Sequence, residues 1–464
     1  MASEDRNALE RASMHALSFL EALDSTPVAA RDSVAELRRK LTRPLPERGM
    51  DSARVIDELV ADTAGGLNAS QGGRFFGWVI GGGAPAAMAA DWLTTVWDQN
   101  AGIYACAPAA SVVEEIAGGW LKDLFGLPSE ASFAFVTGTQ MGHVTCLAAA
   151  RHAVLAARGW DVERRGYCGA PRIRILANSE RHASVDRAVR LLGFGSDAME
   201  LLPIDDDACV TPQGLSAALE GRDEPAVVVL QAGELSRASF DPFADLAPIA
   251  RAAGAWVHVD GAFGLWARVS PAHADLARGL ELCDSWVTDG HKYLNVPYDS
   301  GFAFVRDSNA HRAAMTSVAS YMPDSGDARD AVHWNPEFSR RARAFPVYAA
   351  LRQLGREGLE NLVARTCRHA EMLATRIAAL PGAELVATPR LNQALVRFLD
   401  PNGKSDDRRT EEIIAKINAS GEALFGGVTH NGRRAMRISV CNWRTSEADV
   451  ERAIAAVAKA LSET

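Results

Sequence analysis

The sequence Asp289-Gly-His-Lys-Tyr-Leu-Asn-Val-Pro-Tyr-Asp-Ser-Gly301 lies between two short apolar runs, Ser285–Thr288 and Phe302–Val305, that predict strands. Lys292 therefore comes just after a strand that we expect to be buried. The chain has 43 arginines and only six lysines, so a lysine is an uncommon choice for a basic residue here. Burial favours the neutral form of an amine, and a neutral amine can form a Schiff base with an aldehyde. An ordinary surface lysine in a loop is the alternative interpretation.

Between residues 130 and 306, short β-type runs alternate with helical stretches. This alternation predicts right-handed crossovers and an α/β fold with a mostly parallel seven-stranded sheet, covered by helices on both faces. Catalytic groups in such sheets gather beyond the carboxyl ends of the strands. The expected strands are Phe133–Thr137, Arg172–Ala177, Met199–Pro203, Ala226–Gln231, Ala255–Asp260, Ser285–Thr288 and Phe302–Val305.

The flanking segments have a different pattern. Residues 1–75 show helical spacing without strands and predict an N-terminal segment that lies on another surface, such as a second subunit. Residues 76–315 form the expected large domain. Residues 316–464 hold a polar loop, a long helix and a small C-terminal α/β domain, for which we expect strands at Glu384–Ala387, Gln393–Leu399 and Met436–Val440.

Composition excludes several classes of function. The net charge is −9 and no basic block is present, which argues against nucleic acid or an anionic membrane as the main partner. The seven cysteines are scattered without a CxxC pair, which predicts reduced thiols in the cytoplasm and no structural zinc site. No run has the length of a bilayer span, and the N-terminal residues do not have the pattern of a signal peptide. We therefore expect a cytoplasmic enzyme without a metal.

Three further features lie at other strand ends. Asp260, in His258-Val-Asp-Gly-Ala262, is placed to pair with a protonated pyridine nitrogen, to cap a helix or to bind magnesium. The loop Thr137-Gly-Thr-Gln-Met-Gly142 precedes a long helix and can bind a phosphate or form a simple tight turn. His182 begins a helix, where it can stack on a flat cofactor or stay solvated. Together with Lys292, these features suit one cofactor that carries a phosphate, an aldehyde and a pyridine ring.

On these motifs, the chain resembles the group II pyridoxal-phosphate-dependent amino-acid decarboxylases, the family of the aromatic-L-amino-acid, histidine, tyrosine and glutamate decarboxylases. The resemblance extends from Phe75-Phe-Gly-Trp78 through His258-Val-Asp260 and His291-Lys292 to Ser339-Arg-Arg-Ala-Arg-Ala-Phe345. It implies a fold like that of the fold-type I pyridoxal-phosphate-dependent transferases, with pyridoxal 5'-phosphate as cofactor. It also implies a homodimer with active sites at the subunit interface.

The resemblance implies a role for each matching residue. Lys292 forms the internal aldimine, Asp260 pairs with the pyridine nitrogen, and His182 stacks on the ring. The other cofactor-binding residues that it implies are Ala262 on the second face of the ring, Thr139 and Gln140 at the phosphate, and His291 next to the lysine.

Tyr321 heads the polar loop, where members of this family keep a catalytic tyrosine. After carbon dioxide leaves, Cα must be protonated, and a phenol brought in by loop closure, or a histidine aided by it, can deliver that proton while water is excluded. Some relatives have phenylalanine here and form aldehydes by oxidative deamination. The tyrosine in this chain favours simple decarboxylation, with a tyrosine that only packs at the surface as the alternative.

The substrate pocket is the least defined part of the prediction. Trp78, Ile80 and Tyr104 fall where relatives line the side-chain pocket, and the two aromatic rings suit an aromatic amino acid by stacking, although they would serve equally as core residues.

The sequence departs from many relatives near the ring. The run Ala232-Gly-Glu-Leu-Ser-Arg-Ala238 replaces a Thr-rich run, and Asp289 stands where some relatives have asparagine. Ser236 can supply a hydroxyl near the ring, whereas Glu234 or Arg237 could instead bind a charged substrate. The substrates of the best-known members are therefore not assumed for this chain.

Two other readings remain open. An aminotransferase or an aldehyde-forming oxidative deaminase would use the same cofactor scaffold, and Arg437 does not discriminate between these reactions and decarboxylation. A non-enzymatic scaffold protein is a third possibility, against which the intact set of Lys292, Asp260 and His182 argues.

Overall fold

The computed structural model describes residues 2–316, 326–400, 402–404 and 406–463. The chain forms two compact units. The larger unit comprises Val79–Glu371 with Ala387–Ala394, and the smaller unit comprises Met1–Trp78, Met372–Val386 and Leu395–Thr464. The division into 1–75, 76–315 and 316–464 stays a prediction.

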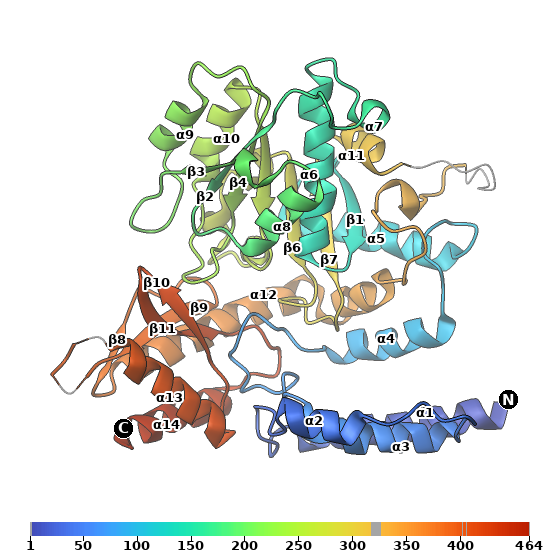
Figure 1. Cartoon of the computed structure of the whole chain (residues 1–464), viewed down its shortest axis with the longest axis vertical. Helices are drawn as coiled ribbons and strands as arrows, with labels where there is room; N and C mark the ends of the chain where they lie inside the picture. The colour runs from blue at the N-terminus through green and yellow to red at the C-terminus, as the bar shows by residue number, and fades with distance from the viewer. Residues whose placement is uncertain (1, 317–325, 401, 405, 464) are drawn as a thin grey trace. The chain divides into compact units, whose positions relative to one another are not determined.

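The larger unit is built on a seven-stranded sheet with the strand order β1-β7-β6-β5-β4-β2-β3 (Figure 1). Neighbouring strands from β2 to β6 pair in parallel, whereas β7 runs antiparallel to both β6 and β1. All seven runs predicted as strands are strands, and the mostly parallel α/β sheet is confirmed. The strands are β1 Ser132–Val136, β2 Arg174–Asn178, β3 Met199–Leu202, β4 Ala226–Gln231, β5 Trp256–Asp260, β6 Ser285–Asp289 and β7 Gly301–Val305.

Helix α6 (Thr139–Ala156) is the central helix on the sheet. It contacts β1, β4, β5, β6 and β7, with α8 (Ala183–Leu191) and α11 (Ser308–Met315) beside it. An added Cβ at Gly142 would lie only 2.8 Å from Cγ1 of Val287 on β6, so this glycine lets α6 pack close to the strands. A large apolar core fills the space between α6, α8 and the sheet.

The other helices that begin in the larger unit complete its layers around the sheet. Helix α12 is interrupted at Gly355, which has φ 60°. These helices are α4 Pro85–Trp97, α5 Pro108–Phe125, α7 Val162–Arg165, α9 Pro212–Leu219, α10 Phe243–Ala252 and α12 Ala344–Ala378, with 3₁₀ segments at Ser196–Ala198, Gly264–Val269, Ala274–Ala277, Leu280–Leu282 and Ala331–His333.

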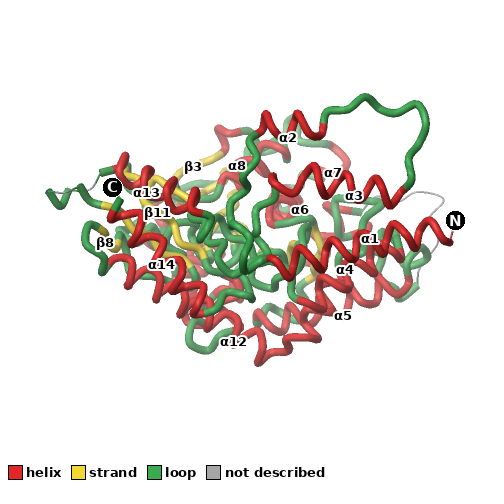
Figure 2. Tube along the Cα trace, turned by 90° about the horizontal axis from the view of Figure 1, so that it is seen from below, coloured by secondary structure: helices red, strands yellow, loops and turns green. Residues whose placement is uncertain are grey.

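The smaller unit combines N-terminal helices with a four-stranded sheet in the order β10-β11-β9-β8. Helices α1 and α3 lie side by side (Figures 1 and 2), where Asp57 of α3 binds Arg11 and His15 of α1, each at 2.6 Å. The elements are α1 Ala2–Ala22, α2 Val34–Leu41, α3 Ser52–Thr63, a 3₁₀ segment Ala64–Gly66, β8 Ala383–Leu385, β9 Gln393–Phe398, α13 Asp407–Ser420, β10 Gly426–His430, β11 Arg433–Ser439 and α14 Glu447–Ser462.

Two elements of the smaller unit were not predicted. Strand β10 begins with Gly426-Gly427, a pair that is typical of turns. Helix α13 is rich in charged residues and buries only Thr410 and three isoleucines, so its apolar period is weak. Among the described residues, none of the helices has the length and apolarity needed to cross a bilayer.

Two helical glycines in the larger unit predict opposite responses to the same substitution. Gly119 of α5 is exposed with no atom within 4 Å of an added Cβ, so Gly119→Ala should raise the free energy of unfolding by about 0.5–1 kcal/mol. Gly142→Ala should lower it by about 1–3 kcal/mol, because its Cβ overlaps Val287. Urea unfolding followed by circular dichroism measures both changes. A stabilised Gly142→Ala variant would show that α6 does not pack on β6 at this distance.

Candidate active site

The predicted lysine and the predicted carboxylate lie at the carboxyl ends of neighbouring strands. β5 ends at Asp260 and β6 ends at Asp289, and the two strands are parallel, so both ends meet at one edge of the sheet. The backbone N–H of Asp289 donates to the carbonyl oxygen of Ala262 at 3.0 Å and ties the two ends together. Nζ of Lys292 lies 2.9 Å from Oδ2 of Asp289 and 6.0 Å from the ring centroid of Phe263.

Asp289 is a site residue that the sequence analysis noted only as a departure from relatives. Its carboxylate is buried, and Oδ1 accepts the backbone N–H of Thr139, the first residue of α6, at 2.6 Å. Burial opposes ionisation, but the neighbouring positive charge of Lys292 outweighs it and lowers the pKa of Asp289 below its ordinary value. Asp289 therefore presents a carboxylate to Lys292 and to the start of α6 together.

Asp260 is also buried and ionised. Its Oδ1 accepts the backbone N–H of Ala262 at 3.2 Å, and its Oδ2 lies 3.4 Å from Nε2 of His143. Burial would raise the pKa of Asp260, but His143 first, then His182 and Lys292, lower it far below its ordinary value. A carboxylate that stays charged in a buried place can hold a proton on a pyridine nitrogen.

The start of α6 has the chemistry of an anion site. Three buried polar atoms have no hydrogen-bond partner among the described residues: Oγ1 of Thr139, Nε2 of Gln140 and Oγ of Ser300. Buried polar groups are rarely left unpaired, and donors at a helix N-terminus favour an anion. Thr139 and Gln140 were predicted to bind phosphate, and Ser300 joins them in this structure. The residues present therefore fit the phosphate of the implied cofactor.

The two predicted histidines have different surroundings. His291 is mostly buried, its Nδ1 accepts the backbone N–H of Ser300 at 3.2 Å, and its ring stacks on Tyr298 at 4.3 Å. Burial lowers the pKa of His291, so its ring is neutral at pH 7. His182 is exposed at the start of α8, where its Nδ1 accepts the backbone N–H of Ser184 at 3.2 Å. Stacking of His182 on the cofactor stays a prediction.

The loop that departs from relatives is held by its own carboxylate. Glu234 is buried, and its two oxygens accept the backbone N–H groups of Ser236 at 2.6 Å and of Arg237 at 2.9 Å. Nη1 of Arg237 donates to the backbone oxygen of Asp206 at 2.8 Å. Both charged side chains therefore have roles within the loop, and contacts of Glu234 or Ser236 with a substrate stay predictions.

The three residues predicted to line the side-chain pocket are assigned to different compact units, and their role stays a prediction. Trp78 belongs to the smaller unit and is 58% exposed, whereas Ile80 and Tyr104 belong to the larger unit. Ile80 precedes Gly81, whose N–H donates to the carbonyl oxygen of His291 at 3.2 Å, and an added Cβ at Gly81 would overlap the carbonyl oxygen of Lys292. This role of the glycine run was not predicted from the sequence. Tyr321 lies outside the described residues.

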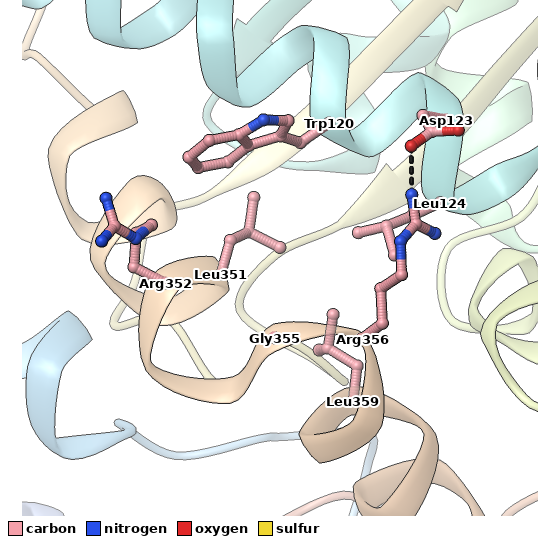
Figure 3. Close-up of a pocket in the computed structure, with 8 residues that line it drawn as sticks. All are labelled: Trp120, Asp123, Leu124, Leu351, Arg352, Gly355, Arg356 and Leu359. Atoms are coloured by element: carbon pink, nitrogen blue, oxygen red, sulfur yellow. Dashed lines mark hydrogen bonds and ion pairs between the residues drawn. The ribbon is translucent and has the colours of Figure 1, made fainter.

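A separate cavity of about 400 Å³ opens where α12 is interrupted (Figure 3). It contains none of the predicted site residues, and an ion pair between Asp123 and Arg356 closes one side of it. Its lining residues are Trp120, Asp123, Leu124, Leu351, Arg352, Gly355, Arg356 and Leu359. The candidate site therefore rests on the polar groups around Lys292 and not on this cavity.

Comparison with known proteins gives a consistent result. Residues 35–399 match the model of the pyridoxal-dependent decarboxylase conserved domain. L-2,4-diaminobutyrate decarboxylase of Rhizobium meliloti (strain 1021) is 29% identical over 393 residues, which cover 82% of this chain and 76% of that protein. Aromatic-L-amino-acid decarboxylase of Bacillus atrophaeus is 25% identical over 462 residues, which cover 96% of this chain and 93% of that protein. The crystal structure of Oryza sativa TDC with PLP and tryptamine has the same fold, with a TM-score of 0.93 at 22% identity. The match covers 100% of this chain and 98% of that chain.

The position of Lys292 predicts covalent attachment of the cofactor. After borohydride reduction of the protein loaded with pyridoxal phosphate, the peptide that contains Lys292 should carry the cofactor mass, and Lys292→Ala should abolish both this label and turnover. Lys122 is the matched control, because its Nζ is partly buried on the carbonyl oxygens of Ser129 and Ala131. Lys122→Ala should keep the label, and labelling of the Lys292→Ala protein at another lysine would contradict the assignment. Peptide mass spectrometry measures both.

Proposed function

The chain belongs to the pyridoxal-dependent decarboxylase family and is a pyridoxal-phosphate-dependent amino-acid decarboxylase, and we propose that its substrate is an aromatic L-amino acid. The main support is the likeness to the aromatic-L-amino-acid decarboxylase of Bacillus atrophaeus, which extends over nearly all of both chains. Trp78 and Tyr104 add exposed aromatic surface that suits a flat side chain.

A second candidate substrate is 2,4-diaminobutyrate. The relative from Rhizobium meliloti that is named for this substrate is 29% identical, over a smaller share of both chains. A second ammonium group on the substrate would need a carboxylate partner. Glu234 is the acidic residue predicted near the pocket, and its two oxygens already accept backbone N–H groups of its own loop. This engagement favours the aromatic substrate.

The proposed mechanism divides the work between cofactor and protein. Bound pyridoxal phosphate supplies an aldehyde for the substrate amine and an electron-withdrawing ring for the bond that breaks as carbon dioxide leaves. Thr139, Gln140 and Ser300 would hold its phosphate through their unpaired polar atoms. Asp260 would keep the proton on the ring nitrogen, because its own pKa lies far below 7.

The residues around Lys292 would control proton transfer. Asp289 binds the Lys292 ammonium at 2.9 Å and keeps it beside the start of α6. Neutral His291 stacks on Tyr298 and excludes water from one side of Asp289, from which its Nε2 lies 3.6 Å. We assign protonation of the substrate Cα to Tyr321, on its place in the sequence.

A homodimer in the cytoplasm completes the proposal. Helices α2 and α3 contain no fully buried residue, and the N-terminal segment exposes the apolar side chains Leu9, Met14, Leu17, Val34, Leu41, Val55 and Leu59. Exposed apolar surface of this kind is typical of a subunit interface. The seven cysteines are free thiols, as is usual in a reducing compartment. We propose that segment 1–75 contacts the partner subunit.

The experiment that tests the function is mass spectrometry of the loaded protein with a pool of L-amino acids that includes dopa, 5-hydroxytryptophan and 2,4-diaminobutyrate. We expect one aromatic amine together with carbon dioxide. Diaminopropane as the main product would replace the substrate assignment with the second candidate. An aldehyde with peroxide, or a keto acid, would overturn simple decarboxylation.

Tyr321→Phe should lower the rate of amine formation by about 100-fold and raise the share of aldehyde, because general acid catalysis at Cα is lost. Tyr348→Phe is the control, since Tyr348 stacks on Trp120 at 5.0 Å and its hydroxyl accepts a hydrogen bond from Nη1 of Arg352 at 3.0 Å. Mass spectrometry measures the rate of amine formation and the ratio of amine to aldehyde in both variants. An unchanged rate and ratio in Tyr321→Phe would remove this tyrosine from the mechanism.

A further inference from the structure

A chain of polar side chains runs from Asp260 into the interior of the larger unit. Oδ2 of Asp260 lies 3.4 Å from Nε2 of His143, an ion-pair distance that is longer than an ordinary hydrogen bond. Nδ1 of His143 lies 2.9 Å from Nε2 of His258. Nδ1 of His258 lies 2.9 Å from Oγ of Ser285, which accepts the indole N–H of Trp256 at 2.9 Å. Four consecutive contacts therefore connect the site carboxylate to an indole at the start of β5.

This polar chain lies inside the apolar core. His143, His258 and Ser285 are 0% exposed and Trp256 is 7% exposed. Trp256 and the neighbours of His143 on α6, such as Cys146 and Leu147, belong to the apolar core between α6, α8 and the sheet. Polar groups in such a place are costly unless each one is satisfied, so the order of donors and acceptors along the chain is tightly constrained.

Trp256 and Asp260, the two ends of this series of polar side chains, fix the position of one proton. An indole N–H can only donate, and an ionised carboxylate can only accept. The nitrogen of His143 that faces Asp260 must therefore carry a proton. If both rings are neutral, one arrangement alone satisfies every contact: Trp256 donates to Ser285, Ser285 to His258, His258 to His143, and His143 to Asp260. Burial holds the pKa of His258 well below its ordinary value, so His258 is neutral.

We propose that Trp256, Ser285 and His258 hold His143 as the neutral Nε2–H tautomer, and that His143 thereby keeps Asp260 ionised and oriented toward the ring nitrogen of the cofactor. His143 is a positioning residue in this account, because it acts through Asp260. The proposal rests on the proposed role of Asp260 and adds to it the device that sets its charge.

The alternative source of Asp260 ionisation is the positive charge of Lys292 and of His182. Both also lower the pKa of this carboxyl, and so does His143, which faces Asp260 from the buried interior at 3.4 Å. The Lys292 side chain is 20% exposed and His182 is also exposed. Solvent therefore screens these two residues more than it screens His143. Removal of the His143 N–H should therefore leave a buried carboxyl that binds a proton itself and competes with the ring nitrogen for it.

Three substitutions at His143 separate the contacts. Glutamine places an amide N–H near the position of Nε2 and keeps the contact with Asp260. Asparagine places its amide near Nδ1 and keeps only the contact with His258. Leucine removes both. The matched control is His311→Leu, since His311 is also 0% exposed and lies between Oγ of Ser132 at 2.8 Å and the carbonyl oxygen of Trp334 at 2.9 Å.

The first readout is the cofactor itself. Protein is reconstituted with pyridoxal phosphate labelled with ¹⁵N in the ring, and the ¹⁵N chemical shift and the cofactor dissociation constant are measured. His143→Leu and His143→Asn should move the shift toward the unprotonated ring and weaken binding by about 10- to 100-fold, the range expected when a buried charge loses its polar partner. His143→Gln and His311→Leu should stay near the wild type. A wild-type shift in His143→Leu, or equal losses in His143→Leu and His311→Leu, would overturn the proposal.

The second readout needs neither cofactor nor substrate. In the cofactor-free wild-type protein labelled with ¹⁵N-histidine, the rings of His143 and His258 should both give the shifts of the neutral Nε2–H tautomer. Single substitutions to glutamine assign the two signals. An Nδ1–H tautomer or an imidazolium at His143 would overturn the proposal even if amine formation is confirmed. Conversely, the expected tautomers without any amine product would reject the proposed function alone.

Discussion

The hydrogen bond from Thr139 to Asp289 is the contact on which the site depends. It joins the first residue of α6 to the last residue of β6 at 2.6 Å, and the same carboxylate binds Lys292 at 2.9 Å. A helix N-terminus carries partial positive charge, so Asp289 has two favourable partners that together outweigh the cost of its burial. Because the backbone of Asp289 also bonds to Ala262, one residue sets the relative positions of the lysine, the helix start and the end of β5.

The second constraint is that the buried negative charges of the site must be balanced by protein groups, because bulk water does not reach them. Asp260 and Asp289 are both buried carboxylates on adjacent parallel strands, and they remain ionised because each has its own donors. Lys292 pairs with Asp289, whereas His143 faces Asp260 from α6. This separation suits the different tasks proposed for the two carboxylates, Asp289 toward an amine and Asp260 toward a ring nitrogen. Close packing of α6 on the sheet at Gly142 is what brings His143 within reach.

The sequence alone predicted the sheet and two of its strand-end residues for physical reasons that are local. Apolar runs of four to six residues mark buried strands, and Lys292 and Asp260 come directly after such runs. The partner of Lys292 is local, because Asp289 lies three residues before it, but the partner of Asp260 is not. His143 is far from Asp260 in the chain, and a histidine on a buried helix face has no period or spacing that separates it from an ordinary core residue. Such contacts follow only from the three-dimensional packing.

The loop between β4 and α10 shows why the reaction class is easier to derive than the substrate. Glu234, whose place among relatives suggested a new substrate contact, closes its own turn by accepting the backbone N–H groups of Ser236 and Arg237. An unusual residue at a site can therefore be required by the backbone rather than by the ligand. The cofactor groups, in contrast, are defined by chemistry that few residues can supply: an amine, an ionised buried carboxylate and unpaired donors at a helix start. The side chains predicted to line the substrate pocket, such as Tyr104, are ones for which many alternatives would fold equally well.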